Sequence, residues 1–268
     1  MSSSDKRRRE IAREKARRQD DRRREEESRR RRRLQIVVGL VVAALVLTMA
    51  VGIFASLSSA DTTGDEVAGA SGEATVAAGQ CDYVDNAPDP STVTDVGRPP
   101  ADPGDLGELT ATMTVNGADV VMALDGTAAP CTVGSWEFLA AADYFDGTVC
   151  HRLTTSDTLG VLQCGDPSGT GRGGPGYRFA EENLDGATYL AGTVAMANTG
   201  VPASTGSQFF LVHSDSVLPP QYTVVGTIVD GLDVVEEIAA AGTVEGASDG
   251  TPSSGADVSD LVVERSGS

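Results

Sequence analysis

The chain has 268 residues and a formal net charge of −18, and its charges are divided unevenly along its length. Residues 1–33 contain 16 Lys and Arg against 8 Asp and Glu, whereas the later residues contain 5 Arg, no Lys and 31 acidic residues. A surface that binds nucleic acid requires clustered cations, so the composition after residue 33 argues against a nucleic-acid partner. The change of sign also indicates that the two parts meet different surroundings.

An uncharged, mostly apolar run of 24 residues, 34–57, follows the basic tail. This length is enough to cross a bilayer as one helix, whose backbone groups pair internally. Five arginines at 29–33 favour a cytoplasmic N-terminus, so we expect a single-pass cell-membrane protein with an extracytoplasmic C-terminal part. A cleaved signal peptide is the alternative, because small residues at 58–60 suit cleavage, although signal cores span only about 7 to 15 residues.

The chain after this run divides into three predicted segments. Residues 58–80 are mostly small, polar or acidic and cannot bury a core, which predicts a flexible acidic linker. Residues 81–105 carry many prolines and predict an extended arm packed on the folded domain, which itself spans 106–268. For the basic cytoplasmic tail, 1–33, anionic lipid headgroups are one expected neighbour, and a solvated retention signal is the other interpretation.

Short strands dominate the predicted domain. Apolar and small polar residues alternate on both sides of Asn116-Gly117, a strong hairpin signal. Residues 130–145 begin with a proline and place apolar residues at helical spacing, which predicts an amphipathic helix, and 232–242 predicts a second one. Further strand-like runs lie at 148–153, 161–166, 192–197, 207–213, 222–229 and 258–265. This count favours a mainly β fold, an antiparallel barrel of about eight strands closed at its ends by two helices.

Four cysteines lie in the part assigned to the oxidising side of the membrane, where disulfides are the expected state. Cys150 and Cys164 flank two consecutive predicted strands, so a hairpin can bring them opposite one another. That pairing leaves Cys81 to connect the arm to Cys131 at the start of the helix. Four free buried thiols are the alternative, and no metal site is expected, because no cysteine pair has the short spacing of a zinc site.

The glycine-rich stretch after residue 164 contains the pattern G-x-G-x-x-G at Gly169, Gly171 and Gly174. A dinucleotide site requires a helix to begin at this point, but Pro175 and Gly176 follow instead. The two histidines of the chain have no evident nucleophile partner, which argues against a hydrolase.

Arg152 is one of only five cations after residue 33. A surface salt bridge would explain a lone arginine in so acidic a domain. However, Gln163, Asn198 and Gln208 each lie in a segment that also supplies small apolar or aromatic residues. Polar groups beside an apolar hollow suit an extended peptide as ligand.

Residues 106–265 resemble a cyclophilin domain. The family's F-H-R segment appears as 150–152, its Q-G-G-D as 163–166, its M-A-N as 196–198 and its G-S-Q-F-F as 206–210, in the family's order. The resemblance implies a closed antiparallel eight-stranded β-barrel capped by two α-helices. The anchor, arm and cysteines further resemble the membrane-bound cyclophilins of high-GC Gram-positive bacteria, which implies a site on the cell-wall side of the membrane.

The resemblance also implies roles for individual residues. Arg152 corresponds to the catalytic cation, Gln163 and Gln208 to groups that bond the substrate backbone, and Phe210 to the floor of the proline pocket. The remaining substrate-binding positions are His151, Val161, Ala197, Asn198, Val217, Leu218 and Tyr222. No metal and no organic cofactor are implied.

The match departs from the family's pattern around the pocket. Ten residues separate Arg152 from Gln163 where the family usually has seven, and the family's Phe-Met pair falls near Gly160-Val161. The family's tryptophan in the next loop is replaced by Val217 and a histidine by Tyr222. An indole offers a donor and a large flat contact, so its absence predicts weak cyclosporin binding.

The implied activity is peptidyl-prolyl cis-trans isomerisation, which would accelerate the folding of extracytoplasmic or cell-wall proteins that contain X-Pro bonds. A proline-peptide-binding or chaperone-like module without useful turnover is the main alternative. An envelope scaffold whose cytoplasmic tail is the working part is a further one.

Overall fold

The computed structural model describes residues 80–86 and 90–265, which all fall within one compact unit, residues 73–268. The predicted tail, the predicted membrane-spanning run 34–57 and all but the last residue of the predicted linker lie outside the described residues. Among the residues that are described, no helix combines the length and apolar character needed to cross a membrane.

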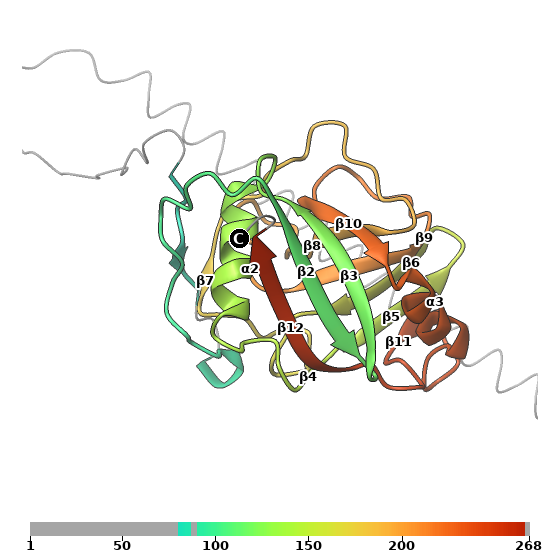
Figure 1. Cartoon of the computed structure of the whole chain (residues 1–268). Coiled ribbons are helices and arrows are strands. Elements are labelled where there is room, and N and C mark those ends of the chain that lie inside the picture. Colours follow the sequence, from blue (N-terminus) through green and yellow to red (C-terminus); the bar gives the residue numbers. More distant parts are fainter. Residues whose placement is uncertain (1–79, 87–89, 266–268) are drawn as a thin grey trace, which may run out of the picture. The chain divides into compact units, whose positions relative to one another are not determined.

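One curled, fully antiparallel sheet forms most of the domain (Figure 1). Its strand order is β11-β5-β6-β9-β8-β10-β3-β2-β12-β4. The bounds are Glu108–Val115 for β2, Ala118–Asp125 for β3, Thr148–Val149 for β4, Arg152–Ser156 for β5, Leu159–Cys164 for β6, Thr193–Met196 for β8, Phe209–Ser214 for β9, Val224–Asp230 for β10, Asp249–Gly250 for β11 and Asp257–Arg265 for β12.

The expected closed barrel of eight strands needs correction. The eight strands of four or more residues do occupy consecutive places in the sheet, but the two-residue strands β11 and β4 stand at its ends. Within the described residues no ladder joins these two end strands, and backbone pairing links the two sides of the sheet only by an isolated bridge between Val149 of β4 and Asp166, just after β6. The reason lies at the outer edge of β5, whose backbone groups pair with Asp249 and Gly250 of β11 and are not available to β12.

The hairpin predicted at Asn116-Gly117 is present as β2 and β3, whose last pair is Val115 with Ala118. Asn116 and Gly117 have φ values of 51° and 80°, the two positive angles that a tight two-residue hairpin turn requires. Side chains along both strands alternate between buried and more exposed positions, as expected for strands with one face on the core.

The two expected helices are α2, Pro130–Ala140, and α3, Leu232–Ala241. A short 3₁₀ turn, η1, spans Pro90–Thr92. The expectation that the first helix is amphipathic is wrong in one respect, because α2 has no exposed residue. Its outer face is covered by the arm, where the Tyr83 hydroxyl donates to the carbonyl of Cys131 at 2.7 Å and Pro103 packs beside Gly134.

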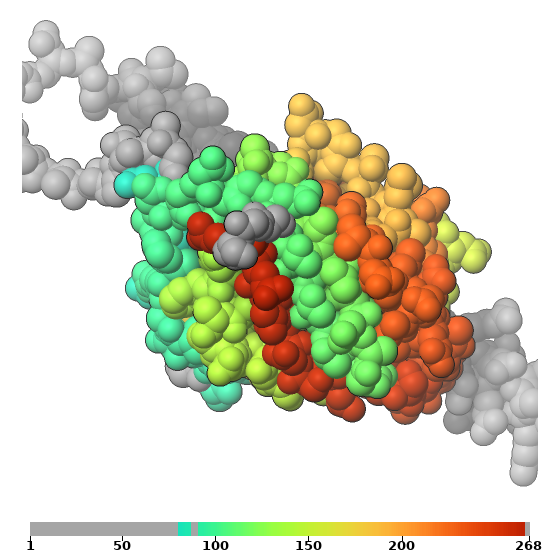
Figure 2. All heavy atoms as spheres, viewed as in Figure 1, coloured from blue at the N-terminus to red at the C-terminus, as the bar shows by residue number. Residues whose placement is uncertain are grey.

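The arm is joined to the domain by strand pairing, ring contacts and a disulfide. Strand β1, Val84–Asp85, pairs antiparallel with β7, Tyr177–Arg178, in a separate two-stranded sheet. The ring of Tyr83 meets the buried rings of Tyr177 and Phe179 edge-on at 5.4 and 5.3 Å. In the space-filling view of Figure 2, the teal atoms of the arm form the left edge of the coloured domain.

Both expected disulfides are present, Cys81–Cys131 and Cys150–Cys164. The first links the arm to α2. The second joins Cys150, two residues before β5 begins at Arg152, to Cys164, the last residue of β6, which directly follows Gln163.

Buried apolar side chains form two clusters. The larger one fills the space between α2 and the sheet, where Trp136 lies 4.5 Å from Phe209 between ring centroids. The smaller one consists of Val161, Tyr189, Ala195, Phe210 and Val212, and it includes predicted site residues. The two neighbouring phenylalanines of β9 therefore point to opposite faces of the strand, one into each cluster.

Candidate active site

A hollow of about 260 Å³ lies over the smaller cluster and gathers most of the predicted site residues. Its walls come from β5, β6 and β9 and from the loops that follow β8 and β9. The lining residues are Arg152, Leu159, Val161, Gln163, Ala197, Asn198, Phe210, Leu218 and Tyr222. Eight of these nine positions were predicted from the sequence, although they lie up to 70 residues apart in the chain.

Arg152 reaches this hollow from the first position of β5, directly opposite Gln163 of β6 in the strand register. Its Nη1 donates to the Gln163 side-chain oxygen at 3.2 Å. Its Nε and Nη2 donate to the two carboxylate oxygens of Asp249, each at 2.8 Å. Hydrogen bonding to Asp249 raises the pKa of Arg152, so the guanidinium keeps its charge at every working pH.

A line of side-chain amides continues from the guanidinium. The Gln163 amide donates to the side-chain oxygen of Gln208 at 2.8 Å, and the Gln208 amide donates to the carbonyl of Gly173 at 2.9 Å. The glycine-rich loop is itself held by Asp166, whose carboxylate accepts the N–H groups of Ser168 and Gly173. This stretch therefore serves as a rigid support for the glutamine pair and does not offer a dinucleotide site.

Phe210 forms the apolar side of the hollow and is only 5% exposed. Its ring meets Tyr222 edge-on at 5.6 Å and lies 6.2 Å from Tyr189. The Tyr189 hydroxyl donates to the carbonyl of Tyr222 and accepts that residue's N–H, at 2.9 and 3.0 Å. Tyr189, which the sequence interpretation missed, thus fixes the loop that carries Tyr222.

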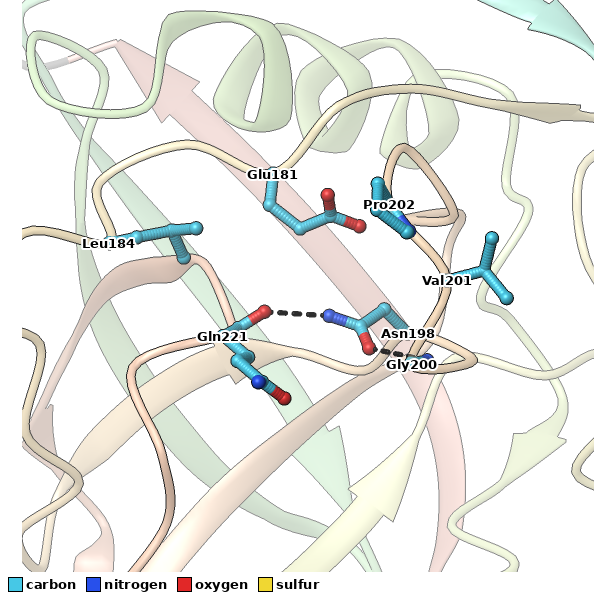
Figure 3. Close-up of a pocket in the computed structure, with 7 residues that line it drawn as sticks. All are labelled: Glu181, Leu184, Asn198, Gly200, Val201, Pro202 and Gln221. Carbon is cyan, nitrogen blue, oxygen red and sulfur yellow. Dashed lines mark hydrogen bonds between the residues drawn. The ribbon is translucent and has the colours of Figure 1, made fainter. Parts of the chain in front are cut away.

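Asn198 lies between this hollow and a second one, also of about 260 Å³. Figure 3 shows its side chain extended between two loops, with the amide donating to the carbonyl of Gln221 at 2.7 Å and the oxygen accepting the N–H of Gly200 at 2.9 Å. The side chain therefore braces the walls of the hollow.

Leu159 is a lining residue that the sequence interpretation missed. It shares one face of β6 with Val161 and Gln163, so strict alternation along the strand is a signal that could have found it. Gly160, the residue between them, has no room for a side chain, because a Cβ there would collide with Ser214 of β9. The wall at Gly160-Val161, where the family's Phe-Met pair falls, is thus lined by Leu159 and Val161.

Three predicted site residues do not line the hollow. Gln208 stands one hydrogen bond behind it, on Gln163. His151 packs its ring against Gly171, and burial, followed by the charge of Arg152, lowers its pKa, while Asp166 opposes the shift. Val217 is 79% exposed and bonds through its N–H to the carbonyl of Thr158.

Asp249, the partner of Arg152, was also missed. It sits in the run Gly246-Ala247-Ser248-Asp249-Gly250, which formally matches a nucleophile motif, G-x-S-x-G. That motif requires a strand-to-helix turn, whereas this run leads from α3 to the two-residue strand β11. In this run, Asp249 and not Ser248 therefore contributes to the site, through its hydrogen bonds to Arg152.

The arrangement places a fixed cation and amide groups on one side of an apolar hollow. The hollow suits a small ring, and the amides suit the backbone of an extended peptide. The described residues 80–86 and 90–265 contain no group of three or more His, Cys, Asp or Glu that could hold a metal ion. The chemistry available to the described groups is electrostatic stabilisation at a position near Arg152.

Comparisons with known proteins agree with this site. The family model for cyclophilin type peptidyl-prolyl cis-trans isomerases matches residues 110–262. The probable peptidyl-prolyl cis-trans isomerase B of Mycobacterium tuberculosis H37Rv is 42% identical over 193 residues, which are 67% of this chain and 61% of that protein. The protein of the same name from Mycobacterium leprae is 44% identical over 188 residues, 64% of this chain and 62% of that one. The chain thus spans about three fifths of these relatives.

A comparison with solved structures also finds cyclophilins. The crystal structure of a cyclophilin type peptidyl-prolyl cis-trans isomerase from Cryptosporidium parvum aligns with a TM-score of 0.52 at 25% identity, covering 59% of this chain and 98% of that one. The family model covers more than half of the chain, and the residues it matches include those that line the hollow. The chain therefore belongs to the cyclophilin-type peptidyl-prolyl cis-trans isomerase family.

Proposed function

We propose that the protein is a peptidyl-prolyl cis-trans isomerase that rotates X-Pro bonds in extended or unfolded polypeptides. The observation that carries this proposal is the meeting of Arg152 and Phe210 in one hollow, with Gln163 between them. A protein of the same family, that from Cryptosporidium parvum, has been crystallised in the presence of the dipeptide Ala-Pro. A proline ring of this kind is the ligand that the apolar side of the hollow fits.

The proposed mechanism follows from the chemistry of the amide. Rotation of a peptide bond costs about 18 to 20 kcal/mol because resonance is lost, and X-Pro bonds rotate without help in tens to hundreds of seconds. As the bond twists, the proline nitrogen regains its lone pair. A guanidinium donor of Arg152 near that nitrogen stabilises the twisted state more than the planar one, which is the condition for catalysis.

Other residues of the hollow hold the substrate during this rotation. Phe210 and Leu218 pack on the proline ring, while the amide of Gln163 keeps the flanking backbone in place. Because no covalent bond breaks, no nucleophile is needed, and the scheme works with the neutral His151 that burial favours.

The proposal is tested by a protease-coupled assay with a chromogenic tetrapeptide that contains an Ala-Pro bond. We expect the cis-to-trans rate to rise in proportion to the concentration of the full-length chain. A rate equal to that of heat-inactivated protein would contradict the proposal. If the chain binds the peptide but leaves the rate unchanged, the protein is instead a proline-peptide-binding module.

We also propose that the domain is extracytoplasmic and anchored in the cell membrane by residues 34–57. The uncharged apolar run behind five arginines supports this, and so do two disulfides, which persist in oxidising compartments. A reporter fused after Ser268 should be active only outside the cytoplasm, and the full-length chain should stay with membranes after alkaline washing. Release of a shortened soluble form would favour cleavage near Ala60.

A further inference from the structure

Asp249 lies on β11, the two-residue strand at the end of the sheet (Figure 1). Its two carboxylate oxygens accept hydrogen bonds from Nε and Nη2 of Arg152, each at 2.8 Å. This is a two-point contact between planar groups, which fixes direction as well as distance. The guanidinium that the proposed function uses is therefore held from behind by a carboxylate 97 residues away.

A count of donors shows which edge of the guanidinium remains for a substrate. The group has five N–H donors, one on Nε and two on each terminal nitrogen. Asp249 takes the Nε donor and one Nη2 donor, and Gln163 takes one Nη1 donor. The side of the group formed by Nε and Nη2 is therefore occupied, and the donors that remain are one N–H on Nη1 and one on Nη2.

The backbone holds Asp249 in place independently of its side chain. Asp249 and Gly250 pair with Thr154 and Leu153 of β5, the same strand that carries Arg152. The carbonyl of Ser248 accepts the N–H of Thr155 at 2.9 Å. Replacing the carboxylate thus leaves the backbone bonds of β11 available and alters the guanidinium contact selectively.

Two effects of the carboxylate oppose each other. It orients the donors of Arg152, which favours rotation of a correctly placed bond, but its negative charge partly compensates the cation. The side chains of Arg152 and Asp249 are 40% and 54% exposed, so water screens the compensation of charge. Solvent does not weaken the orienting effect in the same way, because that effect comes from the geometry of the two hydrogen bonds.

We propose that Asp249 is a positioning residue for proline isomerisation, which acts through Arg152 by clamping the guanidinium so that its terminal N–H groups face the twisting bond. This role rests on the proposed function. The plainer interpretation is a surface ion pair that only stabilises the fold. The pair between Arg265 and Glu137 offers a matched control, because it is also a two-point contact, at 2.6 and 2.8 Å, and neither residue lines the hollow.

The experiment compares full-length variants in detergent by protease-coupled isomerase rates and by dissociation constants for the same Ala-Pro peptide. Asp249→Ala should lower kcat/KM by about three- to tenfold, with the dissociation constant changed less than twofold. Asp249→Asn keeps one acceptor and should lose less. Glu137→Ala should keep wild-type turnover, and Arg152→Ala should show the same residual rate whether or not Asp249 is also replaced.

Each outcome bears on the role. Turnover of Asp249→Ala equal to that of wild type overturns it, and so does an equal fold-loss from Asp249→Ala in the wild-type and Arg152→Ala backgrounds, because a structural effect does not need Arg152. An Arg152 Nε–H signal in NMR that exchanges equally fast in wild type and Asp249→Ala also overturns it. A wild-type chain without isomerase activity overturns the proposed function and this role together, whereas an active wild type with an unaffected Asp249→Ala overturns the role alone.

Discussion

Tyr83 in the arm and Arg152 in the hollow both bond to distant parts of the chain, but in opposite surroundings. Tyr83 is 8% exposed, lies against two buried rings and adjoins a disulfide. Arg152 keeps 40% of its side chain exposed and bonds to polar partners that are themselves partly exposed.

The difference separates stability from function. The contacts of the arm bury apolar area and restrict the unfolded chain, so they act mainly on the free energy of unfolding. The contacts of the hollow orient charges and leave donors available, so they act mainly on turnover. Five sets of substitutions test this separation of unfolding free energy from turnover.

The largest expected effect is the loss of the Cys81–Cys131 bridge in Cys81→Ser/Cys131→Ser. The sequence separation of 50 corresponds to about 4 kcal/mol of unfolding free energy in the chain-entropy model. Isomerase turnover of the folded fraction should stay within twofold, because neither cysteine of this bridge lines the hollow. Urea unfolding can be followed through Trp136, the single tryptophan, which is fully buried. A large loss of turnover at low urea would break the division.

Loss of the second bridge should lower both the free energy of unfolding and the turnover. Cys150→Ser/Cys164→Ser opens a loop with a separation of 14, worth about 3 kcal/mol. Because Cys164 follows Gln163 and Cys150 lies two residues before Arg152, the register of the Arg152–Gln163 pair should loosen without the bridge, and turnover should fall several-fold. Turnover equal to that of wild type would show that β5–β6 pairing alone holds the site.

Arg152→Ala tests the hollow itself. We expect turnover to fall at least about tenfold, equivalent to about 1.4 kcal/mol of transition-state stabilisation, while the urea midpoint shifts little. Circular dichroism provides the check on folding. Equal activity of mutant and wild type would remove Arg152 from the mechanism.

Tyr83→Phe removes one hydroxyl from the arm and leaves the carbonyl of Cys131 without that donor. The expected cost is about 1 kcal/mol in urea unfolding, with unchanged turnover. Burial raises the pKa of Tyr83, so its contribution is present below the unfolded value near pH 10 and is lost as the pH rises above it. The mutant should therefore lose less stability than wild type between neutral pH and strongly alkaline pH.

Val217→Trp should change turnover by no more than a few-fold, because Val217 is 79% exposed and does not line the hollow. Cyclosporin binding, which we expect to be weak in the wild type, should tighten as the indole adds a donor and a flat contact. Calorimetric titration measures both affinities. A low-nanomolar dissociation constant for the wild type would show that the loop from Ser216 to Tyr222 supplies contacts other than the missing indole.

Local patterns predicted the elements of the site well. Alternation around Asn116-Gly117 predicted the first hairpin, and the family's motifs predicted eight of the nine residues that line the hollow. These signals are local because turn geometry and strand alternation depend on neighbours in sequence. Two expectations failed because they depend on remote segments. The first helix is not amphipathic because the arm covers it, and the barrel is not closed by a ladder because β11 pairs with β5.

Three remote contacts were decided only by the tertiary structure. Glu182 caps α2 by accepting the N–H groups of Cys131 and Thr132, although no side chain at the helix start does so. The arm covers the outer face of the same helix. Asp249 reaches Arg152 across 97 positions through the pairing of β11 with β5.

The sequence by itself thus determined which residues can form strands, turns, disulfides and a peptide-binding hollow. Only the tertiary structure decided which carboxylate clamps the guanidinium and which segment covers each edge or face. The physical reason is that the domain carries many interchangeable acidic residues on its surface, and a residue type that recurs so often carries no local signal for its partner. Its partner is selected by the register of strands far apart in the chain.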